Sequence, residues 1–151
     1  MPRALQRLAP WLTHEDRHLR GNAALVFAGL GDPRGFETIR FMLFDRSERL
    51  EGQGIPTAGF SVVRQIRSDR YYAVHLLGEL KDVRAVEPLI PLLEDHEINY
   101  KVAWALGEIG DARAIPPLMA ALGNRDALVR VSAIQALVTL GATEAVPKLE
   151  R

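Results

Sequence analysis

Apolar side chains recur at helical spacing between Tyr100 and Leu122. In the first half of this stretch, three of them mark one face of a helix at i, i+4 and i+7: Val102, Leu106 and Ile109. Gly110 and Asp111 follow. Glycine tolerates the left-handed conformation that ends a helix, and aspartate can cap the start of the next helix. The second half carries another apolar stripe at i, i+3, i+4 and i+7: Ile115, Leu118, Met119 and Leu122. The pattern predicts a helical hairpin too short to bury both stripes without similar neighbours.

The same hairpin recurs along the chain. In the predicted first helices, one apolar position is occupied by Leu30, Leu80, Ile109 and Leu140. In the predicted second helices, one apolar position is occupied by Leu5, Phe36, Val86, Ile115 and Val146. The steps along this second series are 31, 50, 29 and 31 residues, which indicates a tandem repeat with one insertion of roughly 20 residues.

Three further positions repeat in the same register. Arg20, Arg70 and Arg130 share one position, where repeat 3 has Asn99 instead; a second position holds Asp32, Asp82 and Asp111. We expect both ladders to be hydrogen-bonding struts between repeats, with a ligand-binding stripe as the alternative. Gly78 and Gly107 are equivalent within first helices, and we expect them to let the paired helix approach closely.

The repeated segments resemble HEAT repeats, in the short version found in phycobilisome-lyase-like HEAT proteins. The residues that carry the resemblance are LLGELKDVRAVEPLIPLLED at 76–95 and ALGEIGDARAIPPLMAAL at 105–122, with weaker copies at 27–43 and 136–149. The resemblance implies an all-α fold, an α-solenoid of about four helical-hairpin repeats with an N-terminal capping helix. It says little about function, because this fold hosts many unrelated roles.

We assign all of residues 1–151 to a single domain of HEAT-like repeats. Its parts are a cap at 3–13, repeat 1 at 15–44, an insertion at 45–66, repeat 2 at 68–94, repeat 3 at 97–122 and repeat 4 at 126–151. Repeat 4 stops within its second helix. Its end therefore frays, meets another chain, or belongs to a longer protein.

Composition narrows the classes of function. The chain has no cysteine, which excludes disulfides, thiolate catalysis and cysteine-ligated metal sites. Its 19 basic and 19 acidic residues cancel, so no overall charge attracts nucleic acid or an acidic membrane. No signal peptide or membrane-spanning segment is recognisable, and we expect a cytoplasmic protein.

The sequence contains little evidence for a metal site or for catalytic residues. His14-Glu15 and His96-Glu97 are reminiscent of the paired ligands of HEAT-repeat di-iron hydroxylases, but the two pairs fall at different positions of the repeat and do not face each other. No nucleophile elbow or phosphate loop occurs. We therefore expect no catalytic residues, no metal and no cofactor, although enzymatic activity stays an open question.

The favoured function is a non-catalytic scaffold or adaptor for protein–protein interaction. It would bind another protein through a concave face lined by second helices and through the 45–66 insertion, since long loops are disproportionately functional. The residues predicted to bind the partner are aromatic residues and arginines. They are Arg40, Phe41, Phe44, Arg49, Phe60, Arg64, Arg67, Tyr71 and Tyr72. For Phe41 and Phe44 the alternative is core packing, and for Arg40 a stem that reaches past a neighbour to water.

Two other functions remain as alternatives. A lyase-like or chromophore-handling subunit would need an apolar groove with basic groups for bilin propionates, which Arg40, Arg64, Arg67, Tyr71 and Tyr72 supply in part. If the chain is an enzyme, it is expected to be of this lyase-like kind. A nucleic-acid-processing solenoid would need a strongly basic concave face, and the second helices are not basic. Self-association through the incomplete C-terminal repeat is a further expectation, and no membrane partner is expected.

Overall fold

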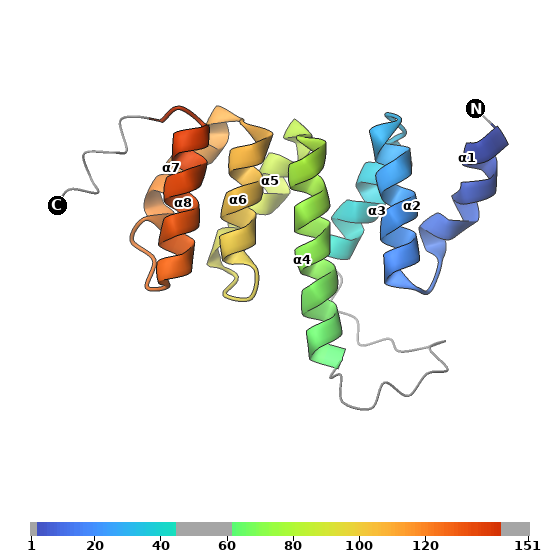
Figure 1. The fold of residues 1–151 in the computed structure, drawn as a ribbon, viewed down its shortest axis with the longest axis horizontal. Helices are drawn as coiled ribbons and strands as arrows, with labels where there is room; N and C mark the ends of the chain where they lie inside the picture. The colour runs from blue at the N-terminus through green and yellow to red at the C-terminus, as the bar shows by residue number, and fades with distance from the viewer. Residues whose placement is uncertain (1–2, 45–61, 143–151) are drawn as a thin grey trace. The chain divides into compact units, whose positions relative to one another are not determined.

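The computed structural model describes residues 3–44 and 62–142, except for the side chains of residue 17 and residues 62–66. Every regular element in this described part is an α-helix or a 3₁₀ helix (Figure 1), so the all-α prediction is confirmed. The chain divides into two compact units, residues 1–76 and 77–151. That the whole chain forms one domain with the repeat boundaries given above stays a prediction.

The first unit is built on a helical hairpin. Helix α2 (Arg17–Gly29) packs against α3 (Pro33–Phe44), and it also contacts the 3₁₀ helix η1 (Ala9–Thr13) that follows α1 (Arg3–Leu8). The hairpin and the preceding segment share one apolar core, whose largest buried members are Leu5, Phe27, Phe36, Ile39 and Leu43. This core holds α3 with one face inward and the other exposed.

Helix α4 (Val62–Leu80) follows and runs through the boundary between the two units. It begins at Val62, inside the range assigned to the insertion, so residues 62–66 are helical. The glycines and the proline that favour a loop, Gly52, Gly54, Pro56 and Gly59, lie in the remainder of the insertion, outside the described residues.

The second unit repeats the hairpin. Its elements are η2 (Val83–Ala85), α5 (Val86–Leu89), η3 (Ile90–Glu94), α6 (Asn99–Ile109), η4 (Ala112–Ala114), α7 (Ile115–Ala121) and α8 (Ala127–Thr139). Helix α8 packs against both α6 and α7, while α6 also contacts η3 and α5. The core between these elements contains the predicted stripe residues Val102, Leu106 and Leu118, together with Leu137 of α8, and all four are buried.

Prolines shape the second helices differently in repeats 2 and 3. Pro116 and Pro117 fall in the first turn of α7, where a missing N–H donor costs little. In repeat 2 the helix is instead divided into η2, α5 and η3, and Pro91 lies at the start of η3. Proline in a helix interior removes a hydrogen bond and clashes with the preceding turn, which explains the change to 3₁₀ geometry.

The turn after each first helix contains one residue in the left-handed conformation, at the same position of the repeat. Gly31, Gly110 and Gly141 have φ values of 76°, 78° and 69°, and Lys81 has φ 51° at the equivalent position of repeat 2. Only glycine enters this region without a steric penalty. The turn is therefore encoded by backbone geometry, and Lys81 is the exception.

Close approach between first helices depends on the two predicted glycines. A Cβ atom on Gly78 would lie 2.6 Å from the Trp104 ring, and one on Gly107 would lie 2.8 Å from the Ala136 Cα. Close approach is therefore confirmed at both positions, but the predicted neighbour is wrong. The first helix of the following repeat approaches each glycine, rather than the paired second helix of the same hairpin.

The aspartate ladder has a local role, so the expectation that it links repeats is wrong. Asp32, Asp82 and Asp111 each accept a hydrogen bond from the backbone N–H two residues later, at 3.0, 2.9 and 2.9 Å. The residue at that later position is always arginine, and its guanidinium pairs with the same carboxylate. Each Asp-X-Arg pair thus caps the start of its own second helix.

Candidate partner-binding surface

A stripe of exposed side chains lies along the outer face of α3. Glu37, Arg40, Phe41 and Phe44 follow one another at i, i+3, i+4 and i+7, and we call them the α3 stripe. Phe41 is 61% exposed and Phe44 is 48% exposed, while Phe36 on the opposite face is 3% exposed. The apolar residues of α3 therefore lie on two faces, one of which is buried in the core and one of which is exposed.

Arg40 lies beside these rings with its charge in water. Its guanidinium contacts the Glu37 carboxylate at 3.2 Å, and both side chains are about half exposed. An exposed pair of this kind contributes little to stability. Arg40 is thus an outward residue, although its equivalents in repeats 2 and 3 are the half-buried Ile90 and Met119.

The end of α3 is fixed by a buried arginine. Arg70 of α4 is 1% exposed, and its Nε donates a hydrogen bond to the carbonyl oxygen of Leu43 at 3.0 Å. This bond satisfies one of the carbonyl groups that a helix C-terminus leaves unpaired. It also holds the last turn of α3, which carries Phe44, in place.

The residues at the position equivalent to Arg70 in the other repeats differ in the hydrogen bonds that they make. Arg130 donates from Nη1 to the carbonyl oxygens of Asn124 and Arg125, both at 2.9 Å. The Nε of Arg20 and the Nδ2 of Asn99 are buried without a hydrogen-bond partner in the described part of the chain. The predicted strut between repeats is therefore established for Arg70, whereas Arg130 braces the turn that precedes its own helix.

Tyr72 is engaged in packing within the first unit. Its hydroxyl donates to the Asn22 Oδ1 at 2.7 Å, and its ring lies 6.0 Å from the ring of His18. A Cβ atom on Gly21 would come within 3.2 Å of the same ring. Tyr72 therefore joins α4 to α2, and the described contacts do not connect it with the α3 stripe.

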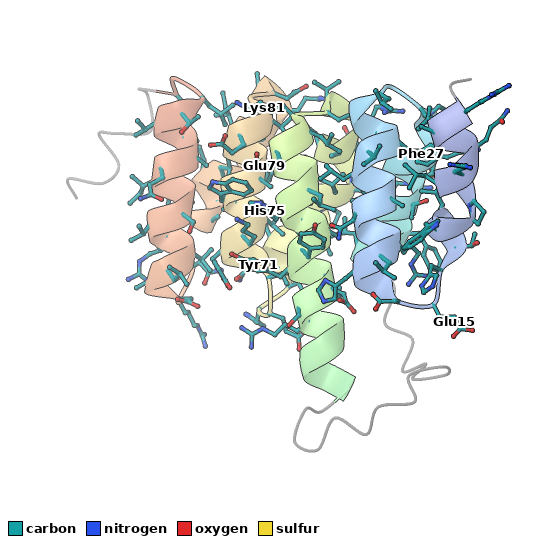
Figure 2. All side chains as sticks on the ribbon, turned by 45° about the vertical axis from the view of Figure 1, so that its right-hand side comes forward. Glu15, Phe27, Tyr71, His75, Glu79 and Lys81 are labelled. Atoms are coloured by element: carbon teal, nitrogen blue, oxygen red, sulfur yellow. The ribbon has the colours of Figure 1, made fainter. Side chains whose placement is uncertain are left out.

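Tyr71 and Arg67 present exposed side chains on α4, and Figure 2 shows Tyr71, His75 and Glu79 at successive turns of this helix. Tyr71 is 36% exposed. Arg49 and Phe60 lie outside the described residues, as does the side chain of Arg64. Of the predicted partner-binding residues, the structure brings together Arg40, Phe41 and Phe44.

Sequence reasoning missed the arginine partners of the aspartate ladder. The hydrogen bond from Arg34 lowers the pKa of Asp32, and Arg84 and Arg113 likewise lower the pKa of Asp82 and Asp111. Arg113 also reaches the preceding repeat, where it contacts the Glu87 carboxylate and the Val83 carbonyl oxygen, both at 3.2 Å. The signal was present in the sequence as three Asp-X-Arg triplets in one register.

A second missed feature lies on α6. The Lys101 ammonium sits 3.5 Å from the centroid of the Trp104 ring, a cation–π arrangement. Burial lowers the pKa of Lys101, and the carboxylates of Glu79 and Glu108 partly oppose that shift. Lysine three residues before tryptophan is the signal that could have indicated this pair.

Residues 3–44 and 62–142 contain no group of three or more His, Asp or Glu side chains placed to hold a metal ion. Within the same ranges, none of the helices combines the length and the apolarity that crossing a bilayer requires.

Comparison with known proteins places these observations in a family. The sequence model described as HEAT repeats matches residues 67–137 and 95–151. The chain belongs to the HEAT-repeat family. Together with the helices described above, this confirms the predicted α-solenoid fold class. No curated protein matches the chain.

A solved structure of another HEAT-like protein is similar to this HEAT-repeat chain. It is the complex of CpcE and CpcF of phycocyanin lyase from Nostoc sp. PCC7120, matched with a TM-score of 0.65 and 24% sequence identity. The match covers 95% of this chain and 55% of that one, so this chain spans little more than half of its length. A likeness at this identity shows the shared fold.

Proposed function

We propose that this HEAT-repeat chain is a non-catalytic scaffold that binds another protein. The observation that carries the proposal is the exposure of Phe41 and Phe44 on the α3 stripe. Large aromatic side chains contribute most of the binding energy at many protein interfaces, and they are costly to leave in water. That the similar structure is a complex of two proteins, CpcE and CpcF, supports a protein as the class of partner.

The charge around the stripe suggests which partner surface fits. Residues 1–76 contain 11 basic residues, all arginine, and 8 acidic residues. Arg40 and Arg67 are exposed in this unit. A partner that offers an apolar patch bordered by carboxylates would satisfy both the rings and the guanidinium groups. The 45–66 insertion is proposed to contribute to the same contact.

The test compares proteins captured by three forms of the chain. We expect Phe41→Ser/Phe44→Ser to lose a specific partner, with Kd raised on the order of 100-fold because two interface anchors are removed. Val26→Ser is the matched control, since Val26 is 44% exposed on α2 of the same unit. Capture is quantified by mass spectrometry, and binding of the purified partner by calorimetry.

Deleting residues 50–60 provides a second arm. We expect helix content and the melting temperature to stay nearly unchanged while partner capture is lost. A collapse of the melting transition would mean that the insertion supports the fold. Equal capture by wild type and the double serine variant would contradict the role of the α3 stripe, and a bilin that co-purifies would favour the chromophore-handling alternative.

A further inference from the structure

The segment formed by α1 and η1 has an exposed apolar side that the later second helices keep buried. On this side Ala4 and Trp11 are exposed and Leu8 is half-buried. The residues in register with these three in repeats 1, 2 and 3 are all buried: Gly35, Ile39, Met42, Ala85, Leu89, Leu92, Ala114, Leu118 and Ala121. On the other side of the segment, Leu5 and Leu12 are buried in the core of the first unit. The segment thus leaves open one side that three repeats cover.

In repeat 1, this side is covered by the first helix of the same hairpin. Gly35 of α3 lies so close to α2 that an added Cβ atom would be 2.2 Å from the Ala28 backbone nitrogen. The same atom would be 2.4 Å from the Ala24 carbonyl oxygen. Ala4 is the equivalent of Gly35, so the open side of α1 is the side on which a first helix packs.

Helix α2 is exposed at the position where the preceding first helix packs in the second unit. Gly78 lies against Ala105 of α6, and Gly107 lies against Ala136 of α8, and both alanines are buried. Val26 of α2 is in register with these alanines, yet it is 44% exposed. The exposed positions of the two elements together form what we call the α1–α2 surface, which consists of Ala4, Leu8, Trp11 and Val26.

Two exposed arginines border this surface. An open hollow of about 490 Å³ is lined by Arg3, Ala4, Arg7 and Leu8. Arg3 is in register with the arginines of the Asp-X-Arg caps, but Met1 stands where those caps have aspartate. In each cap the aspartate lies in the turn that follows the first helix. A docked helix that ends in a carboxylate would therefore give Arg3 the ion pair that its equivalents have.

We propose that the α1–α2 surface binds an amphipathic helix of another protein, placed as a first helix is placed in the later hairpins. The helix has small apolar residues opposite Ala4 and Val26, because bulky ones would prevent the close approach. Its C-terminal end carries a carboxylate that pairs with Arg3. Burial of the Trp11 ring, which is 41% exposed, contributes much of the apolar contact.

The first helices of a second copy are poorly suited to this role. In α2, α6 and α8 the apolar residues Phe27, Leu106 and Leu137 are already buried within their own units. A second copy would have to unpack such a helix before it could bind, whereas a helix of a different protein carries no such cost. The occupant is therefore assigned to a different protein.

The α1–α2 surface does not include the α3 stripe, and the inference does not rest on the function proposed for that stripe. The positions of α3 in register with Ala4 and Leu8 are buried, whereas the stripe lies on the exposed face of α3. Loss of helix binding and loss of partner binding through Phe41 and Phe44 are consequently separable results.

The probe for the experiment is a peptide of residues 99–111, which contains α6 and ends in Asp111. Helix α6 is chosen because its own hairpin has Ala114 at the position of Ala4. The C-terminus of the peptide is amidated, so that the side chain of Asp111 is the carboxylate at that end.

A lactam bridge keeps the peptide helical, since an isolated helix of this length is marginal in water. It joins Lys101 to the glutamate side chain introduced by Ala105→Glu. Ala105 lies on the side that contacts the preceding first helix, so the bridge is remote from the hairpin contact. We expect the full chain to bind this peptide with a Kd below roughly 100 μM, measured by calorimetry.

Ala4→Glu is expected to raise this Kd on the order of 100-fold, because the larger, charged side chain occupies the place of the docked helix. Gln6→Glu is the matched control. It adds the same charge to the same helix at an exposed position outside the α1–α2 surface, and should bind the peptide as the wild type does. Circular dichroism verifies that both variants keep the helix content of the wild type.

The pairing of Arg3 with the terminal carboxylate has its own test. Arg3→Gln in the chain and Asp111→Asn in the peptide are each expected to weaken binding on the order of 10-fold. The two changes together should weaken it no more than either alone, because they remove the same ion pair. Additive losses would contradict the pairing.

Two other results would overturn the proposal. One is an absence of peptide binding at millimolar concentration, or equal binding by the wild type and Ala4→Glu. The other is a dimer of the chain alone, measured by sedimentation equilibrium, that Ala4→Glu abolishes, since this would assign the surface to a second copy.

Discussion

At the scale of single residues, the left-handed turn after each first helix shows where the chain departs from its own pattern. Three repeats place glycine there, and repeat 2 places Lys81 with φ 51°. The ammonium of Lys81 contacts Glu108 at 3.7 Å, but the lysine is largely exposed. The ion pair is therefore weak compared with the backbone cost of a side chain in this conformation.

Lys81→Gly is expected to stabilise the chain by about 1 kcal/mol, because glycine removes the steric cost of the left-handed turn. Urea unfolding followed by circular dichroism measures the change. Gly110→Ala is the opposing control, since Gly110 has φ 78°, and should destabilise by about the same amount. A stability of Lys81→Gly below that of the wild type would show that the Glu108 contact is worth more than the strain.

The Asp-X-Arg caps make a prediction about pH. Hydrogen bonding by Arg84 lowers the pKa of Asp82 in the folded chain, so its stabilisation is present above the ordinary carboxylate pKa of about 3.9 and is lost as pH falls toward the folded pKa. Asp32 and Asp111 shift in the same direction. Stability should therefore decline on acidification below about pH 4.

Asp82→Asn tests this directly. Asparagine still caps a helix but carries no titrating carboxyl, so the variant should lose less stability between pH 5 and pH 3 than the wild type does. Thermal melts across this pH range measure the slope. Glu94→Gln removes an exposed carboxylate outside the Asp-X-Arg pairs and serves as the control. Parallel slopes for wild type and Asp82→Asn would contradict the assignment.

At the scale of helices, the sequence predicts which segments are helical much better than how regular they are. The stripes of α6 and α7 follow from periodicity alone. On α6 the predicted residues are buried as expected, whereas of the second stripe only Leu118 is buried and Ile115 and Met119 are half-buried. The sequence does not predict that the second helix of repeat 2 is divided into η2, α5 and η3. Prolines near the start of a helix are tolerated, so their presence does not show at which residue α-helical turns give way to 3₁₀ turns.

The candidate site was predicted only in part for a related reason. Phe36, Phe41 and Phe44 lie on one helix, and spacing cannot decide which apolar face is covered. Burial against α2 settles it by placing Phe36 inward and leaving Phe41 and Phe44 outward. Tyr72 was assigned to the same surface, yet its hydroxyl bonds to Asn22, a long-range contact that local sequence does not encode.

The close packing of α6 against α8 can be tested by a substitution at Gly107. Gly107→Ala should destabilise the chain by roughly 1–3 kcal/mol, because the added methyl group meets the backbone of Ala136 and forces the helices apart. Gly123→Ala is the control in the same unit, where the nearest atom to an added Cβ is the Ala120 carbonyl oxygen at 3.5 Å. Unfolding free energies in urea should separate the two variants.

At the scale of the whole molecule, charge is unevenly shared between the two compact units. Residues 1–76 have 11 basic and 8 acidic residues, and residues 77–151 have 8 basic and 11 acidic residues, so 11 − 8 = +3 is balanced by 8 − 11 = −3. The exposed aromatic residues of the α3 stripe belong to the positive unit. Binding of the proposed partner, whose patch is bordered by carboxylates, should therefore weaken as the salt concentration rises.

The Asp-X-Arg caps have a consequence for how such a chain lengthens. Each cap is complete within three consecutive residues, so a copied segment brings its own helix start with it. A duplicated or transplanted hairpin would need new neighbours only for its apolar sides. Addition of a whole hairpin then leaves no helix start without a cap. The side chains that face outward are the ones free to differ between copies.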